Sequence, residues 1–178
     1  MRKNIELKND MSSKQKGFTL IELMIVLVVI AILGAGVAMA KPAIVFMQQK
    51  SQVNNAVDSI ISDSLAFKGI RPSYPTNLSI AELCKDGYLN TLVCGAANNG
   101  VGANPFAGDW KVTPSAQYGA GHISIELTNI PAGRFQELAD SLAARSKAGC
   151  VRADAACASV KLTPPAANAA GGVVKIDI

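Results

Sequence analysis

One uninterrupted apolar segment near the start of the chain limits its folding more than any other feature. Residues Phe18 to Ala40 read FTLIELMIVLVVIAILGAGVAMA, and Glu22 is the only charged side chain among these 23 residues. A helix rises about 1.5 Å per residue, so this segment would be about 35 Å long, and the core of a bilayer is about 30 Å thick. The segment therefore predicts a transmembrane helix over residues 18–40.

Positive charge is concentrated ahead of the apolar segment. Residues 1–17 hold five basic and two acidic side chains, while the whole chain has a formal net charge of +4. The positive-inside rule places such a leader in the cytoplasm and the rest of the chain on the other side. Because the basicity belongs mostly to the leader, the overall charge does not indicate nucleic-acid binding. A secretory signal peptide has a shorter apolar run of about 7 to 15 residues, although the AMA sequence at residues 38–40 leaves a signal-peptidase cut open.

The helical pattern continues beyond the apolar segment, with apolar residues at every third or fourth position. Pro42 removes one backbone hydrogen bond, and Gly34 and Gly36 weaken the helix just before it. A kink or a melted stretch is therefore expected between Gly34 and Pro42. Prolines beyond Gly69 end the pattern, which predicts one long helix over residues 18–69.

The amphipathic half of this helix needs a surface to cover its apolar face. That face is expected to pack on a sheet of the same chain, and it consists of Val53, Val57, Ile60 and Leu65. The sheet is predicted within a globular domain over residues 72–178, from segments at Asp109–Thr113, His122–Thr128, Ala158–Leu162 and Val173–Ile178. Two shorter helices are predicted at Ser79–Lys85 and Arg134–Arg145. These elements indicate an α+β fold with an antiparallel sheet packed on helices.

Four cysteines follow the predicted membrane segment and are therefore expected in an oxidising compartment, as two disulfides. Three connectivities are possible from the sequence. We favour Cys84 with Cys94 and Cys150 with Cys157, because each pair is close along the chain. A zinc site is the alternative, but the two-residue spacing of a zinc knuckle is absent and His122 is the only histidine, so no metal is expected.

The junction between the leader and the apolar segment carries the most informative string, KGFTLIE at residues 16–22. A carboxylate in an apolar span costs about 2.5 to 3.5 kcal/mol on insertion scales, so Glu22 is expected to have a partner. Cleavage after Gly17 would create a new amine at Phe18. The amine of a neighbouring subunit could then neutralise Glu22 as two apolar helices pack together.

The sequence KGFTLIELMIVLVVIAIL resembles the N-terminal motif of type IV pilins and of the related type II secretion pseudopilins. The resemblance implies that a prepilin peptidase cuts between Gly17 and Phe18, and that the new Phe18 amine is methylated. It also implies that Glu22 guides docking between subunits. The family fold, a long kinked N-terminal helix packed on an antiparallel sheet, agrees with the elements predicted above.

For the whole protein, the resemblance implies a structural role. The precursor would be a single-pass protein of the bacterial inner membrane, and the pilus assembly machinery would build the processed subunit into an extracellular homopolymer, a helical filament. Adhesion, aggregation, motility and conjugation are the uses expected of such a pilus. The leader length and the sequence Asn104-Pro105-Phe106, followed by two strands and a helix, resemble type IVb pilins, while Phe18 resembles type IVa. Type IVb is the prediction.

Two other functions stay open at this point. A type II secretion pseudopilin or a minor pilin would share the leader and the long helix. A membrane-tethered binding module with an uncleaved anchor would share only the apolar segment. No catalytic pattern is formed by His122, Trp110 or the tyrosines, so neither an enzyme nor a cofactor is expected.

Overall fold

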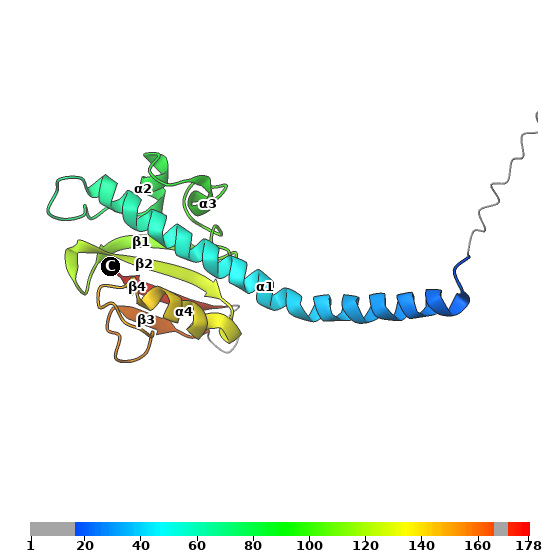
Figure 1. Ribbon diagram of the computed structural model, residues 1–178. Coiled ribbons are helices and arrows are strands. Elements are labelled where there is room, and N and C mark those ends of the chain that lie inside the picture. The colour runs from blue at the N-terminus through cyan, green and yellow to red at the C-terminus, as the bar shows by residue number, and fades with distance from the viewer. Residues whose placement is uncertain (1–16, 166–170) are drawn as a thin grey trace, which may run out of the picture. The chain divides into compact units, whose positions relative to one another are not determined.

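A computed structural model of the protein describes residues 17–165 and 171–178 (Figure 1). The side chains of residues 36–40 lie outside this description, although their backbone is helical. Of the predicted leader, only Gly17 is among the described residues. Within the described residues, no helix is found that is both long enough and apolar enough to cross a membrane.

Helix α1 is the longest element and spans Leu20–Lys68. The chain divides into two units, Met1–Ile44 and Val45–Ile178, and helix α1 contributes residues to both. Gly69 ends the helix with a φ of 58°, and its N–H donates to the carbonyl oxygen of Leu65 at 3.0 Å. Glycine is the residue that adopts such a left-handed conformation most easily, so its position after Lys68 explains the helix end.

The predicted kink in this helix concerns Gly34, Gly36 and Pro42. The helix is continuous through Pro42, so the melted stretch that we considered from the sequence is not observed. Gly34 lies in open space, since a Cβ atom added there would meet nothing within 4 Å. The surroundings of Gly36 lie outside what the structure describes. The kink itself stays a prediction.

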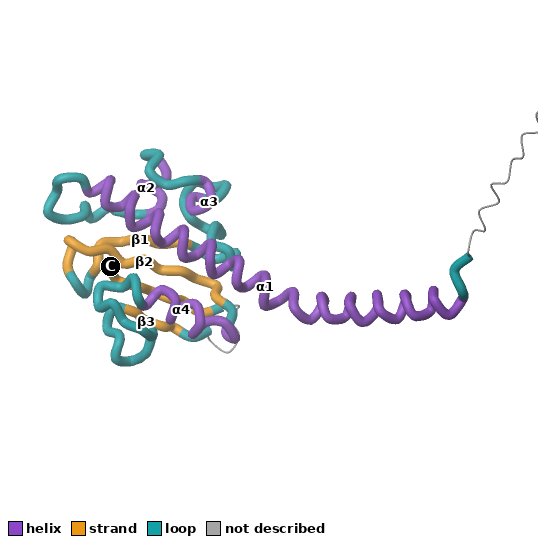
Figure 2. The backbone as a smooth tube through the Cα atoms, viewed as in Figure 1, coloured by secondary structure: helices purple, strands orange, loops and turns teal. Residues whose placement is uncertain are grey.

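A four-stranded antiparallel sheet confirms the α+β fold class. Its strand order is β1-β2-β4-β3, so the strand that comes last in the sequence lies in the interior of the sheet. Side chains alternate between the faces, and most side chains of one face are buried. The strands, shown in orange in Figure 2, are β1 (Trp110–Ser115), β2 (Gly119–Ile130), β3 (Val160–Thr163) and β4 (Gly172–Asp177).

Three shorter helices and a 3₁₀ turn complete the second unit. Helix α2 (Ile80–Lys85) starts at Ser79, whose hydroxyl accepts the N–H of Glu82 at 3.2 Å. Helix α4 (Phe135–Ala143) follows the 3₁₀ turn η1 (Ala132–Arg134). Both helices were expected from the sequence. Helix α3 (Thr91–Cys94) was not, because four residues are too few to show a helical period.

The buried face of helix α1 differs from the prediction at one position. Val53, Val57 and Ile60 are completely buried, as expected. Leu65, however, is 58% exposed, and Ser64 is buried in its place. A helix advances 100° per residue, so the step from Ile60 to position 64 stays on the buried face more closely than the step to position 65. The prediction for Leu65 was therefore wrong.

Side chains at every fourth position of helix α1, one aromatic and three polar, contact η1, α4 and the residues that follow α4. Arg134 lies 4.9 Å from the centre of the Phe46 ring, and Lys50 lies 3.4 Å from Glu137. Further along, the Arg145 guanidinium donates to both carboxylate oxygens of Asp58, at 2.7 and 3.1 Å. Asn54 accepts a third hydrogen bond from Arg145 at 3.0 Å. Positions 46, 50, 54 and 58 form one row on the helix, because residues four apart are neighbours on its surface.

A buried asparagine holds the loop that precedes strand β1. Asn104 donates from its amide to the carbonyl oxygens of Asp109 and Thr128, at 3.2 and 2.9 Å. Its side-chain oxygen accepts the backbone N–H groups of Phe106 and Gly108, both at 2.9 Å. All the hydrogen-bonding groups of this amide are therefore in use within the protein. The loop presents Phe106, whose ring lies 6.3 Å from that of Phe46 on helix α1.

Candidate functional site

The junction that the sequence analysis singled out lies directly ahead of helix α1. Residues 17–19 have no regular secondary structure, and Leu20 is the first helical residue. Phe18 is 79% exposed, and nothing lies within 4 Å of a Cβ atom built on Gly17. Among the described residues, the peptide bond between Gly17 and Phe18 therefore lies outside the helix and is not crowded by other groups.

Thr19 and Glu22 form a reciprocal cap at the start of the helix. The backbone N–H of Glu22 donates to the Thr19 hydroxyl oxygen at 3.3 Å, and the Thr19 hydroxyl donates to the Glu22 carboxylate at 3.4 Å. The same carboxylate accepts the backbone N–H of Thr19 at 3.5 Å. This arrangement is a capping box, which satisfies N–H groups that have no partner within the helix. It also places a negative charge in the first turn, where the helix dipole favours one.

Glu22 therefore has a partner within its own chain, and its partner in a neighbouring subunit stays a prediction. The sequence analysis did not identify Thr19. The signal was present, since a threonine followed three residues later by a glutamate ahead of an apolar run is the pattern of a capping box. The large apolar side chains of residues 20–33 are exposed in the single chain, from 80% for Leu20 down to 47% for Val26.

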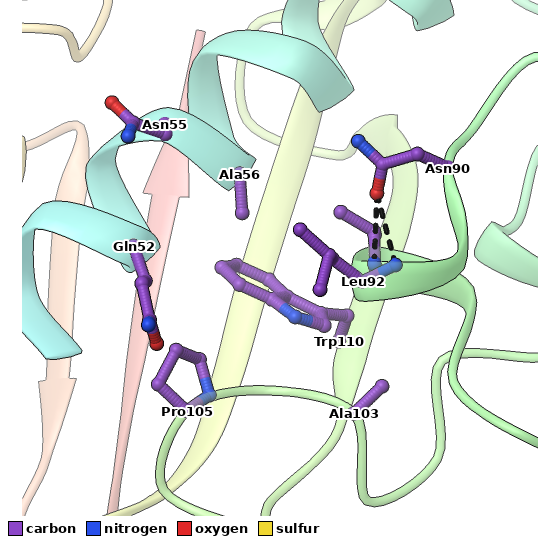
Figure 3. A pocket seen from close by; sticks show the side chains of 9 residues that line it. Gln52, Asn55, Ala56, Asn90, Leu92, Ala103, Pro105 and Trp110 are labelled. Carbon is purple, nitrogen blue, oxygen red and sulfur yellow. Dashed lines mark hydrogen bonds between the residues drawn. The ribbon is translucent and has the colours of Figure 1, made fainter.

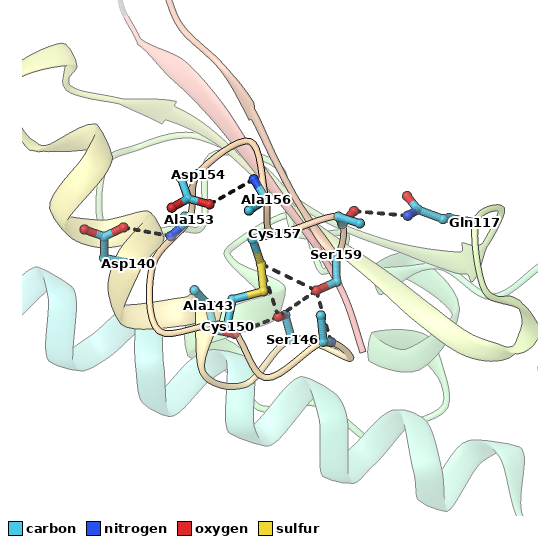
Figure 4. The surroundings of a disulfide bond; sticks show 12 residues. Gln117, Asp140, Ala143, Ser146, Cys150, Ala153, Asp154, Ala156, Cys157 and Ser159 are labelled. Atoms are coloured by element: carbon cyan, nitrogen blue, oxygen red, sulfur yellow. Dashed lines mark hydrogen bonds between the residues drawn. A yellow bond between two sulfur atoms is a disulfide. The ribbon is translucent and has the colours of Figure 1, made fainter.

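The four cysteines are paired as Cys84 with Cys94 and Cys150 with Cys157. The first pair connects α2 with α3, and the second closes the loop between α4 and β3. Behind the second pair, shown in Figure 4, the hydroxyl of Ser159 donates to that of Ser146 at 2.7 Å. Among residues 17–165 and 171–178, no group of three or more His, Cys, Asp or Glu side chains could hold a metal ion.

Hydrogen bonds displace the pKa of two charged groups in the second unit. The backbone N–H of Ala153, 2.8 Å from the Asp140 carboxylate, holds the pKa of Asp140 below its usual value, and the amide of Gln136 adds to this effect. Across the β1–β2 pair, the Glu126 carboxylate lies 2.9 Å from the Lys111 ammonium and raises the pKa of Lys111. Both groups stabilise local packing, and neither faces a partner suited to acid–base chemistry.

Comparisons with known proteins show similarity in the same N-terminal segment and beyond it. Residues 12–38 match the family model described as the prokaryotic N-terminal methylation motif. The chain is also 38% identical over 94 residues to fimbrial protein EcpC of Eikenella corrodens. This alignment covers 49% of the chain and 60% of the fimbrial protein, so the chain spans less than two thirds of that relative.

The fold adds a separate observation to these matches. A long N-terminal helix packs on a four-stranded antiparallel sheet, an arrangement consistent with the type IV pilin fold. A fimbrial relative favours a structural role over an enzymatic one. Together, the methylation motif and the fimbrial relative support the recognition of this chain as a type IV pilin precursor.

Proposed function

We propose that the chain is the precursor of a structural subunit of an extracellular type IVb pilus. In this proposal, residues 18–40 hold the precursor in the bacterial inner membrane with residues 1–17 in the cytoplasm. A prepilin peptidase cuts between Gly17 and Phe18, and the new Phe18 amine is methylated. The pilus assembly machinery then builds the processed subunit into a helical filament.

The position of the Gly17–Phe18 bond is the observation that carries the proposal. A protease needs its substrate backbone extended and free of helical hydrogen bonds, and this bond lies outside helix α1. The capping box starts the helix at the next residues, so the helix does not extend into the cleavage site. Within the described part of the chain, nothing crowds Gly17 and Phe18 is exposed, which supports access of an enzyme to this bond.

Glu22 would change partners when the filament forms. In the uncut chain its carboxylate accepts hydrogen bonds from Thr19. After cleavage, the positively charged amine of Phe18 on a neighbouring subunit would be a stronger partner than the neutral Thr19, because it adds an attraction between opposite charges that grows as water is excluded. The exchange would also remove the cost of an unpaired carboxylate among apolar side chains.

Polymerisation would bury the exposed apolar side chains of helix α1. Leu20, Leu27 and Leu33 are each more than half exposed in the single chain. Contacts between identical subunits that do not close into a ring produce a helical filament. Such a filament could serve adhesion, aggregation, motility or conjugation.

The first test is the intact mass and the N-terminal sequence of the protein from cells that carry a prepilin peptidase. We expect a chain that begins with N-methylated Phe18. A Gly17→Leu variant should keep residues 1–17, whereas a Gly34→Ala variant, changed at another uncrowded glycine of the same unit, should be processed normally. A wild-type chain that still begins at Met1, or that begins after Ala40, would refute the proposal.

A second test separates a pilus subunit from the pseudopilin or minor pilin alternative. The processed protein is produced together with a complete assembly system, and filaments are sheared from the cells and imaged. Long filaments made mainly of this chain are expected, and a Glu22→Gln variant should reduce their yield. Processed protein that never forms long filaments would count against the major-subunit role and favour the alternative.

A further inference from the structure

A row of charged side chains crosses the sheet on the face opposite to helices α1 and α4. These helices lie on one face of the sheet (Figure 1), and alternate side chains of each strand point to the other face. On that other face, the strand register aligns Lys111 of β1, Glu126 of β2, Lys175 of β4 and Lys161 of β3. Neighbouring strands are about 4.8 Å apart, so the row is about 14 Å long.

The glutamate of this row neutralises only one of its lysines. The Glu126 carboxylate forms an ion pair with the Lys111 ammonium at 2.9 Å. Lys175 and Lys161 lie directly opposite each other on antiparallel strands, and within the described part of the chain neither forms an ion pair. The Cβ atoms of opposite residues are about 4.5 to 5.5 Å apart, and like charges in such a pair repel each other.

The other carboxylates near this face are already engaged. Asp177 of β4 is buried and accepts the hydroxyl groups of Ser115 and Ser124. Asp109, directly ahead of β1, accepts the backbone N–H of Gly102 at 2.9 Å. A negative partner for the two opposed lysines is therefore expected from outside the chain.

Protection of the sheet edge explains one of these lysines but not the other. Lys161 belongs to the edge strand β3, and proteins often place lysines on an edge strand to keep other strands from pairing with it. Lys175 belongs to β4, which has a neighbour on each side, and its side chain is half-buried. A half-buried lysine that faces another lysine is unfavourable, so the pair indicates a role beyond protection of the edge.

We propose that Lys161 and Lys175 bind a phosphate group that carries two negative charges. Such a dianion neutralises both ammonium groups, whereas a carboxylate would neutralise only one. Lysine binds phosphate through its positive charge and its three N–H donors. Thr163 is exposed two residues after Lys161 on the same face and adds a hydroxyl group that can donate to a phosphate oxygen. The site lies on an open face of the sheet, so the group can be free phosphate or part of a lipid headgroup.

The test is an NMR titration of the full, isotope-labelled chain in dodecyl maltoside, a detergent without phosphate. Inorganic phosphate is added at a pH where it is mainly a dianion, and sodium chloride of the same ionic strength is the control, because salt screens charges without occupying a site. We expect saturable shifts of the amide resonances of Lys161, Thr163 and Lys175 with phosphate, and small shifts without saturation with chloride. Phosphate binding needs neither processing nor polymerisation, so its failure would leave the proposed function untouched.

A second series of titrations distinguishes the two sources of the phosphate group. Mixed micelles that contain phosphatidic acid are compared with micelles that contain phosphatidylcholine. Saturable shifts with inorganic phosphate would support the proposal and show that the group alone is enough. Saturable shifts with phosphatidic acid only would support it and assign the site to a lipid headgroup. The absence of saturable shifts in both series would overturn it.

Variants that change single charges test the site itself. Lys161→Gln and Lys175→Gln should each weaken phosphate binding by about five-fold, whereas Lys161→Arg keeps the charge and should retain binding. Lys85→Gln is the matched control and should leave binding unchanged, because Lys85 is exposed on α2, which lies near β1 at the opposite edge of the sheet. Equal shifts with phosphate and chloride, or an equal loss of binding in Lys85→Gln and Lys161→Gln, would mean that the anion only screens charge and would overturn the proposal.

Discussion

Replacing Asn104 by alanine should destabilise the protein strongly, although the side chain is small. Asn104 is only 4% exposed and makes four hydrogen bonds to the backbone. The change would leave the N–H groups of Phe106 and Gly108 without their acceptor, and a buried unpaired group costs about 1 to 3 kcal/mol. Some of this loss is recovered where water enters the space, so we expect a total of about 2 to 4 kcal/mol.

Urea unfolding of the full chain in detergent, with the disulfides intact, measures this loss. Trp110 follows the Asn104 loop and reports the transition by its fluorescence. The variant should unfold at a lower urea concentration with an unchanged slope, which is the sign of lower stability without a change in the surface exposed on unfolding. Asn77→Ala is the control, because Asn77 is exposed and no hydrogen bond of its side chain is found in the described part of the chain. A loss below about 1 kcal/mol for Asn104→Ala would refute this reasoning.

Three further predictions concern other contacts of the second unit. Gly108→Ala should lower stability by several kcal/mol in the same unfolding assay, because the new methyl group would collide with the backbone carbonyl of Thr128, whereas Gly133→Ala, in open space, should be nearly neutral. Arg145→Lys should cost about 0.5 to 1 kcal/mol because lysine cannot bind Asp58 with two parallel hydrogen bonds, and Arg152→Lys, which has no ion pair among the described residues, should cost less. Asp140→Asn tests the lowered pKa of Asp140: the charged carboxylate stabilises the fold above its usual pKa of 3.8, and this contribution disappears as the pH falls through the lower folded value. The stability difference between wild type and Asp140→Asn should therefore be constant near neutral pH and shrink in acid, and a difference that does not change between about pH 5 and pH 2 would contradict the assignment.

The sequence predicted the elements that depend on regular patterns. The four strands and helices α2 and α4 lie within a few residues of the predicted segments, because alternation and helical period are visible in neighbouring residues. The same reasoning from neighbouring residues assigned Leu65 to the wrong face of helix α1. Apolarity alone assigned it to the buried face, whereas the geometry of the helix buries Ser64, whose hydroxyl has no hydrogen-bond partner among the described residues.

Features that depend on distant residues could not be predicted. Asn104 is buried because the carbonyl of Thr128 accepts its amide, and these residues meet only after the sheet has formed. Gln52, Leu92 and Trp110 line one pocket (Figure 3) although they lie in three segments far apart in the sequence, so no local pattern indicates it. The capping box at Thr19 and Glu22 is the opposite case, since both of its residues lie within one helical turn and the pattern could have been recognised.

The strand order also constrains when the sheet of this protein can form. Strand β4 comes last in the sequence, yet it lies between β2 and β3 and supplies the central hydrogen bonds of the sheet. Until residues 172–177 have been synthesised, β3 has no neighbour and β2 has only β1. Under the proposed function, a chain translocated from its N-terminal side would therefore keep its sheet incomplete until strand β4 has crossed the membrane. The late arrival of one strand would thus link the formation of the sheet to the translocation of residues 172–177.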